Sequence, residues 1–137
     1  MPSALPATLA AYRRLSALAA PLAAPLIARR LKQGKEDPER LGERRGVASV
    51  PRPPGPLIWI HGASVGEVLA AAGLIERLRA LNVRILLTSG TVTSAAIVAR
   101  RFPPDVIHQY VPLDSPRFVS AFLDHWKPGL ALFIESD

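Results

Sequence analysis

Four short apolar runs, separated by segments of helical spacing, constrain the fold of this chain most strongly. The runs cover residues 57–60, 83–87, 106–111 and 130–134. The first, second and fourth are nearly continuous in apolar residues, which is typical of strands covered on both faces. Helical spacing recurs between them, at 68–81, 94–102 and 117–126. Because alternating strands and helices form parallel sheets through right-handed crossovers, residues 56–137 are predicted to form an α/β, Rossmann-like parallel sheet.

Residues 1–31 combine apolar and basic side chains ahead of this alternation. The apolar stretch from Leu15 to Ala28 is 14 residues long, whereas a helix that crosses a bilayer needs roughly 20. A cleaved signal peptide is the competing interpretation, but basic residues follow the stretch directly at positions 29, 30 and 32. Positive charge on both flanks favours an uncleaved, membrane-associated helix that lies in the interface.

The net charge of +6 belongs mainly to the same part of the chain. Residues 1–45 hold nine Lys and Arg against four Asp and Glu, whereas residues 46–137 hold eight against seven. Nucleic-acid binders place aromatic or hydrogen-bonding readers beside their basic patches, and here the neighbours are aliphatic, so nucleic acid is not an expected partner. Attraction to an anionic membrane surface is the preferred interpretation, with a solvated basic tail as the alternative.

Residues 32–55 separate the amino-terminal segment from the sheet and are predicted to be a polar connector. The stretch is rich in charged residues, glycine and proline, which are typical of turns and loops. A proline cluster at 51–55 ends it as a stiff, non-helical approach to the first strand. The chain contains no cysteine, which excludes a disulfide framework, a thiolate metal site and a cysteine nucleophile.

Parallel α/β sheets bind ligands beyond the carboxyl ends of their strands. Those segments are 61–67, 88–93, 112–114 and 135–137. The first reads His-Gly-Ala-Ser-Val-Gly-Glu, which lacks both the Gly-x-x-x-x-Gly-Lys of a phosphate loop and the Gly-x-Gly-x-x-Gly of a dinucleotide site. Nucleotide binding at this loop is therefore disfavoured.

Glu67 has two interpretations that its local sequence leaves open. Ser64 and Glu67 have the Ser-x-x-Glu spacing of a capping box, in which the two side chains satisfy free amides of a first helical turn. The alternative is a general base at the mouth of the sheet, which the helix dipole would keep ionised. Local sequence alone favours the cap.

The other polar residues near the strand ends give weaker indications of function. The hydroxyl-rich stretch 88–94 must supply one helix cap, and its remaining hydroxyls are candidates for contact with sugar or phosphate. Asp114 precedes Ser-Pro and is predicted to cap a helix. Glu135 closes an apolar strand, which is costly unless the carboxylate is paired or functional. His61 is interpreted as a hydrogen-bonded histidine at a strand end. His108 and His125 have no ligand spacing between them, and no metal site is expected.

Several of these segments taken together resemble the Kdo transferases, which attach 3-deoxy-D-manno-octulosonic acid (Kdo) to the lipid A precursor. The matching segments are 34–36, 40–44, 61–67, 88–93, 106–114, 122–128 and 133–136. The match of any one segment is weak, but the order and spacing of all of them agree with the family from about residue 29 onward. There is one departure: the family usually continues Glu-Ser/Thr-Glu-Leu-Trp-Pro-Asn, whereas this chain has Asp137 at the third position and ends there.

The resemblance implies the amino-terminal half of a GT-B glycosyltransferase, which consists of two Rossmann-like domains. In that family the amino-terminal domain receives the acceptor, and a carboxyl-terminal domain holds most of the CMP-Kdo site. The implied reaction is inverting transfer of Kdo from CMP-Kdo to the lipid A precursor (lipid IVA) in lipopolysaccharide core biosynthesis. The implied location is the cytoplasmic face of the inner membrane, and neither a metal nor another cofactor is implied. We therefore expect a truncated chain that is inactive alone.

The resemblance also implies roles for single residues. The glutamate that matches Glu67 is the catalytic base of the family, which reverses the preference from local sequence. Acceptor or substrate contacts are expected from Ser64, Gly66, Thr88, Thr91, Thr93 and Glu135. Two other functions stay open, namely a non-catalytic membrane-bound module and a nucleotide-dependent oxidoreductase built on the same sheet.

Overall fold

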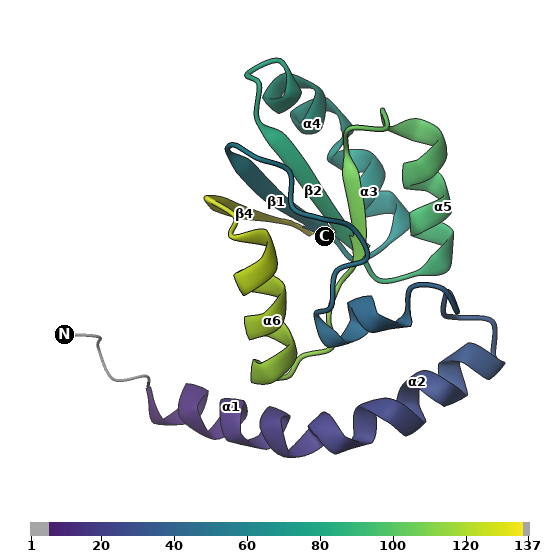
Figure 1. The fold of residues 1–137 in the computed structure, drawn as a ribbon, viewed down its shortest axis with the longest axis vertical. Coiled ribbons are helices and arrows are strands. Elements are labelled where there is room, and N and C mark those ends of the chain that lie inside the picture. The colour runs from purple at the N-terminus through teal and green to yellow at the C-terminus, as the bar shows by residue number, and fades with distance from the viewer. Residues whose placement is uncertain (1–5, 136–137) are drawn as a thin grey trace.

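The computed structural model describes residues 6–135, and a four-stranded parallel sheet forms its centre (Figure 1). The strands are β1 (Leu57–Gly62), β2 (Arg84–Ser89), β3 (Ile107–Tyr110) and β4 (Leu130–Ile134). Their order across the sheet is β3-β2-β1-β4, and every neighbouring pair is parallel. The predicted α/β, Rossmann-like architecture is confirmed at this level. Residues 136–137, the last part of the Kdo transferase resemblance, lie outside the described residues.

Helices cover the two faces of the sheet. α3 (Val65–Ala70), α4 (Ala72–Arg79) and α5 (Val92–Arg101) pack on one face, and α6 (Pro116–Trp126) packs on the other (Figure 1). The single helix predicted at 68–81 is two helices that meet at Ala71. Its amide lies within hydrogen-bonding distance of both the Glu67 and the Val68 carbonyl oxygens, and such sharing marks a helix end.

Two apolar clusters hold these layers together. On the α3–α5 side, the buried residues are Ile60, Val68, Ala71, Ile75, Ile85, Leu87, Val98 and Val106. On the α6 side, Phe122 and Trp126 are fully buried against Leu57 and Leu86. The Trp126 indole also donates a 2.8 Å hydrogen bond to the Gln109 side-chain oxygen, which satisfies the one polar atom that this ring carries into the core.

β4 departs from the sequence prediction. It pairs with β1 alone among the described strands, and Leu130 and Phe133 are 50% and 59% exposed. Leu132 and Ile134 pack on the α3–α5 cluster, but no described element covers Phe133 on the other face. The expectation of a strand covered on both faces is therefore wrong for β4, because α6 lies beneath the centre of the sheet and leaves its outer strand open.

The amino-terminal residues form a bent helical run beneath α6 (Figure 1). It consists of α1 (Ala7–Ala19), a 3-10 turn, η1 (Ala20–Leu22), and α2 (Ala23–Lys32). Pro21 lies in the 3-10 turn, consistent with the inability of proline to continue an α-helical hydrogen-bond ladder. In residues 6–135, no helix is both long and apolar enough to cross a membrane. Contact of this run with a membrane surface stays a prediction.

The segment predicted as a polar connector packs closely on the sheet. It contains a second 3-10 helix, η2 (Leu41–Arg45), and three of its charged residues, Glu36, Glu43 and Arg44, are buried. Gly46 ends η2 with a φ of +78°, and a Cβ at this position would overlap the Phe118 carbonyl oxygen of α6. Glycine is therefore required here both for its backbone conformation and for close approach to α6.

Candidate active site at the carboxyl edge of the sheet

The strand order places a ligand-binding crevice beside β1. The chain runs outward from β1 to β2 and β3 and then returns to the other side of β1 as β4. Ligands of open α/β sheets bind where the order reverses in this way, beyond the carboxyl ends of the strands. Because Gly62 pairs with Ile134, Glu135 follows β4 at the same edge as the loop 63–67. The sheet thus brings together two of the predicted site segments.

The loop after β1 is fixed by close backbone packing. A Cβ on Gly62 would lie 3.0 Å from the Val68 amide nitrogen, so the first turn of α3 would have to shift slightly to admit any side chain here. The Gly90 amide donates a 3.2 Å hydrogen bond to the Ala63 carbonyl oxygen. This contact ties the loop after β1 to the loop after β2, and both predicted site loops therefore form one surface.

Glu67 forms the predicted capping box with Ser64. One carboxylate oxygen accepts hydrogen bonds from the Ser64 amide at 2.8 Å and from the Ser64 hydroxyl at 2.7 Å. The cap interpretation is confirmed, and the same contacts fix the carboxylate at the mouth of the sheet. Gly66 is exposed, with open space where a side chain would project, so the outer side of this loop is open to a ligand.

Thr88 lies below the surface rather than on it. Its side chain is fully buried, and its hydroxyl oxygen accepts a 2.8 Å hydrogen bond from the Trp59 indole and lies 2.8 Å from His61 Nδ1. This placement does not favour direct contact with a substrate. The role that the structure shows for Thr88 is to orient His61, whose ring also meets Phe133 edge-on at 5.9 Å.

His61 is half-buried at the end of β1. Burial lowers the pKa of its imidazole, and this effect outweighs the contact with Thr88 and the negative charge of Glu67, which both raise it. The ring is therefore neutral at pH 7. The interpretation of His61 as a hydrogen-bonded structural histidine agrees with these contacts.

The remaining predicted residues divide between caps and open positions. Thr91 caps α5, because its hydroxyl oxygen accepts a 3.0 Å hydrogen bond from the Ser94 amide. Thr93 and Glu135 are exposed. Asp114 was predicted to cap α6, and this prediction is wrong, since the cap position is held by Ser115. The cap is therefore one residue later than predicted, at Ser115, whose backbone is extended.

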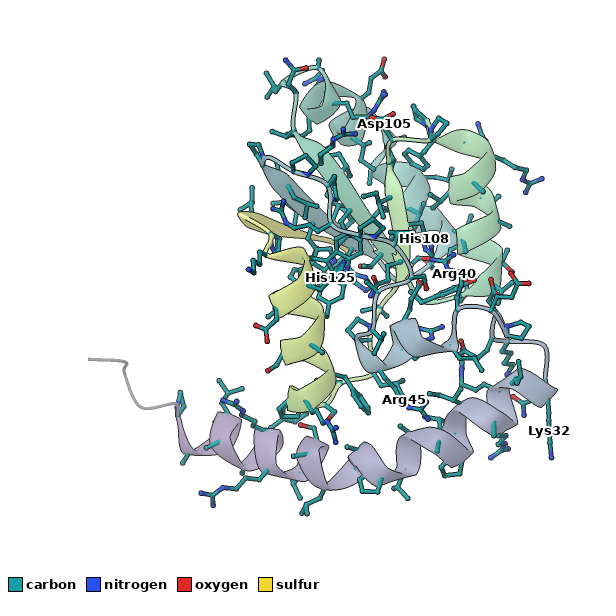
Figure 2. All side chains as sticks on the ribbon, viewed as in Figure 1. Lys32, Arg40, Arg45, Asp105, His108 and His125 are labelled. Atoms are coloured by element: carbon teal, nitrogen blue, oxygen red, sulfur yellow. The ribbon has the colours of Figure 1, made fainter. Side chains whose placement is uncertain are left out.

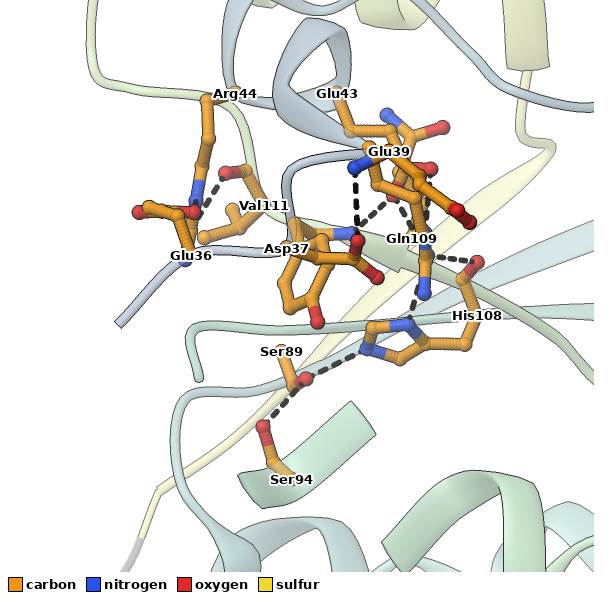
Figure 3. Close-up of polar contacts among 12 residues, drawn as sticks. Glu36, Asp37, Glu39, Glu43, Arg44, Ser89, Ser94, His108, Gln109 and Val111 are labelled. Carbon is orange, nitrogen blue, oxygen red and sulfur yellow. Dashed lines mark hydrogen bonds and ion pairs between the residues drawn. The ribbon is translucent and has the colours of Figure 1, made fainter. Parts of the chain in front are cut away.

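A buried charged cluster beside β3 was not predicted from the sequence (Figure 3). Arg40 and Glu43 form a two-fold ion pair, with nitrogen–oxygen distances of 2.7 and 2.8 Å. Glu43 accepts a 2.8 Å hydrogen bond from the Tyr110 amide, and Arg40 donates one of 2.9 Å to the His108 carbonyl oxygen. The pair thus satisfies the free backbone groups of this edge strand, which a further strand would otherwise pair.

Arg44 connects the same cluster to the carboxyl edge of the sheet. It is 4% exposed, pairs with Glu36 at 3.0 Å, and donates hydrogen bonds to the Gly90 and Val111 carbonyl oxygens at 2.6 and 3.3 Å. Its own carbonyl oxygen accepts a 2.8 Å hydrogen bond from the Leu113 amide. One buried side chain therefore positions both the loop after β2 and the loop after β3.

His108 lies between this cluster and the side chains of Ser89 and Ser94, the second of which is in α5 (Figure 3). Burial, with the positive charges of Arg40 and Arg44, lowers the pKa of its imidazole to about 3. Arg40 lies 3.0 Å from Nδ1, and Ser89 Oγ lies 2.6 Å from Nε2. Because a guanidinium only donates, Nδ1 is the acceptor, and Nε2 carries the proton that is donated to Ser89. Among residues 6–135, no three acidic or histidine side chains gather as metal ligands would.

The sequence carried one signal for this cluster. Arg40 and Glu43 are three residues apart, the spacing at which opposite charges meet on a helical turn, and residues 40–44 form one of the segments that resemble the Kdo transferases. Their burial depends on β3, which lies about 67 residues further along the chain, and nothing in the local pattern indicates that contact.

The model of one protein family, described as 3-deoxy-D-manno-octulosonic-acid transferase (kdotransferase), matches residues 38–137. The chain belongs to the Kdo transferase family. The match includes both site loops, Glu67, Glu135 and the Arg40–Arg44 cluster, so the predicted resemblance is confirmed.

Relatives within the Kdo transferase family match nearly the whole chain. A probable mitochondrial 3-deoxy-D-manno-octulosonic acid transferase from Arabidopsis thaliana is 38% identical over 128 residues, which are 92% of this chain and 29% of that protein. The 3-deoxy-D-manno-octulosonic acid transferase of Rickettsia bellii is 41% identical over 128 residues, 92% of this chain and 31% of the relative. The chain thus spans about a third of the length of these relatives. No solved structure matches it.

Proposed function

We propose that this chain is the acceptor-side domain of a GT-B glycosyltransferase that moves Kdo from CMP-Kdo to the lipid A precursor, lipid IVA, in lipopolysaccharide core biosynthesis. Membership of the Kdo transferase family supports the reaction class. The parallel sheet is the expected architecture for this half of the enzyme. In this proposal a second domain, outside these 137 residues, provides most of the donor site.

The observation that carries the proposal is the position of Glu67. Its carboxylate is held by two hydrogen bonds from Ser64 at the point where the strand order reverses. A general base must be fixed within hydrogen-bonding reach of the hydroxyl it deprotonates. The two interpretations of Glu67 are therefore compatible, because the capping contacts orient the side chain that acts as the base.

The proposed step is a single displacement with inversion. The acceptor hydroxyl oxygen bonds to the anomeric carbon of Kdo as its proton passes to the Glu67 carboxylate. The bond between that carbon and the phosphate oxygen of CMP breaks, and CMP leaves with the electron pair. No metal and no other cofactor enters this scheme, and CMP-Kdo is a substrate.

Acceptor contacts are assigned to the exposed positions of the edge. Ser64 and Gly66 form the open side of the loop after β1, Thr91 and Thr93 lie at the start of α5, and Glu135 follows β4. Thr88 keeps an indirect role in this proposal, because its hydroxyl is occupied by Trp59 and His61.

We further propose that the amino-terminal run lies on the anionic cytoplasmic face of the inner membrane, beside the lipid substrate. Leu15, Leu18 and Leu22 are 66%, 76% and 66% exposed on it. Exposed leucines next to basic residues are the pattern of helices that lie in a membrane interface. This location is independent of the catalytic assignment.

A chimera tests the catalytic proposal. The 137 residues are joined to the remaining part of the Rickettsia bellii relative, and transfer of radiolabelled Kdo from CMP-Kdo to lipid IVA is measured. Glu67→Gln is expected to lower the turnover rate at least 100-fold, since a general base contributes 10²- to 10⁴-fold. Glu76→Gln, an exposed glutamate on α4, is the matched control and is expected to leave the rate unchanged.

Two results would change this assignment. Full activity of the Glu67→Gln chimera, with lipid-bound product formed normally, would remove Glu67 as the base. A folded chimera that binds anionic vesicles but transfers no Kdo would favour the non-catalytic membrane module. The family match argues against the oxidoreductase alternative, which calorimetric binding of NAD would restore.

A further inference from the structure

An apolar groove runs between the amino-terminal helical run and α6. Its main part has a volume of about 810 Å³ and is lined mostly by small side chains, including Ala17, Ala20, Ala24 and Ala121. A second part of about 410 Å³ shares Ala20, Ala23, Ser115 and Phe118 with it. The two parts are therefore neighbours along these shared residues, and we call them together the α1–α6 groove.

The rim of the groove is exposed and apolar. Leu22 and Leu26 line its second part and are 66% and 47% exposed. These side chains belong to the same helical run as the exposed Leu15 and Leu18. A ligand with a long apolar chain could therefore enter the groove directly from the surface to which this run is proposed to bind.

Polar groups converge at one side of the groove. Arg45 and Arg117 line its main part, and neither forms an ion pair within the described part of the chain. Figure 2 shows Arg45 in the space between η2 and the amino-terminal run. Asp114 lines the second part and, with Arg13, a separate neighbouring pocket of about 300 Å³, so the excess of positive charge is greatest in the main part, next to Arg45 and Arg117.

Ser115 provides an independent indication of a ligand. Ser115 lines both parts of the groove, and its buried hydroxyl has no hydrogen-bond partner among residues 6–135. A buried hydroxyl without a partner is costly and calls for an explanation. Ser115 also stands at the start of α6, an 11-residue helix with no side-chain cap and no acidic residue in its first turn, where an anionic oxygen would be favoured.

We propose that the α1–α6 groove binds one acyl chain of an anionic membrane phospholipid, with the head group at Arg45 and Arg117. The alanine-lined part takes the chain, and Ser115 donates its hydroxyl to an oxygen near the ester or phosphate group. The exposed leucine rim favours a bilayer lipid as the source. This site goes beyond the proposed Kdo transfer, and neither assignment requires the other.

Binding of soluble short-chain lipids to the chain tests the site. Dioctanoyl phosphatidylglycerol, kept below its micelle concentration, is titrated by calorimetry and compared with dioctanoyl phosphatidylcholine and with glycerol phosphate. We expect the anionic lipid to bind more tightly than the zwitterionic one and glycerol phosphate to bind most weakly. Arg117→Gln is expected to weaken the anionic lipid about fivefold, the effect of roughly one basic residue near an anionic surface. Arg100→Gln, at an exposed position of α5, is the matched control.

Two groove variants separate binding from folding. Ala20→Phe fills the groove and is expected to abolish lipid binding, while Ala11→Phe, an exposed alanine of α1 outside the groove lining, is expected to leave it unchanged. Ser115→Ala is expected to weaken binding, yet to leave the lipid-free chain at least as stable in thermal unfolding, because it removes an unsatisfied hydroxyl. This opposite response is not expected of a purely structural serine.

Three results would overturn the proposal. Equal affinity for the two phospholipids would show that the groove has no site for an anionic head group. Unchanged binding to a folded Ala20→Phe chain would place the lipid elsewhere. A concentration-dependent dimer that Ala20→Phe dissociates would show that the groove is filled by a second copy of the chain. Kdo transfer by the chimera would stand in each case, since it is measured separately.

Discussion

Replacement of Arg44 by methionine should destabilise the whole sheet edge. Arg44 is 4% exposed and its guanidinium contacts Glu36, the Gly90 carbonyl and the Val111 carbonyl. Methionine retains the apolar stem but leaves both carbonyl oxygens without this donor. Glu36 keeps its 2.7 Å ion pair with Arg30, so its carboxylate does not become entirely unpaired.

The expected loss follows from the number and burial of these contacts. Breaking a buried ion pair by removing one partner costs about 3–5 kcal/mol, and the remaining pair with Arg30 places Arg44→Met near the lower end of that range. The entropy of unfolding is roughly 2.1 cal/mol/K per residue. For a chain of 137 residues, a loss of about 3 kcal/mol therefore lowers Tm by about 10 °C.

The measurement is urea and thermal unfolding followed by far-ultraviolet circular dichroism. Arg45→Met is the matched control, because this neighbouring residue in η2 is only half-buried and forms no ion pair within residues 6–135. A change of about 0.5 kcal/mol or less is expected for it. If Arg44→Met loses less than 1 kcal/mol, or no more than Arg45→Met, then the buried guanidinium does not hold the two loops and our account of the edge is wrong.

Three further predictions follow from other contacts. The pKa of His108 is lowered from 6.5 to about 3, so its contribution to stability is complete above pH 6.5 and is lost as the pH falls towards 3. Relative to His108→Gln, the wild-type chain should lose roughly 2–3 kcal/mol of unfolding free energy between pH 6.5 and 4.5 in urea titrations. Parallel pH profiles of the two chains would contradict this prediction. Gly46→Ala should lose more stability than Gly34→Ala in thermal unfolding, because both residues have positive φ but only a Cβ at Gly46 would meet the Phe118 carbonyl. For Gly34→Ala the expected loss is about 1–2 kcal/mol. Equal losses would show that η2 can move away from α6. Phe122→Ala should cost about 3–5 kcal/mol by chemical denaturation, since its ring is fully buried and lies 4.8 Å from that of Trp59; a loss below 1 kcal/mol would mean that α6 is not part of the core.

The elements that the sequence predicted well are those whose pattern is local. The strands β1 and β2 are runs of apolar residues long enough to be read directly, and the capping box of Ser64 and Glu67 is defined by three residues of spacing. The alternation of strands and helices further required a parallel sheet. These features depend on short-range periodicity and on hydrogen bonds within a single turn. They can therefore be predicted without the tertiary contacts.

The features that the sequence did not predict involve contacts between distant parts of the chain. The exposure of β4 follows from where α6 crosses the sheet, and the burial of Thr88 follows from the side chains of Trp59 and His61 on the neighbouring strand. Neither the run 130–134 nor the hydroxyl-rich segment 88–94 carries information about its neighbours. Burial of a residue is decided by the elements that pack on it.

The sequence alone determined the strand and helix alternation, the capping box and the resemblance to the Kdo transferases. Each of these features depends only on the order and spacing of residues along the chain. The tertiary structure alone decided that residues 36–44 pack against the edge of the sheet. From the sequence alone, a charged segment is predicted to be exposed to solvent, because the distant strand whose free backbone groups bind its side chains is not known. For Glu43 that partner is the Tyr110 amide, and the hydrogen bonds it makes there offset the cost of burying its charge.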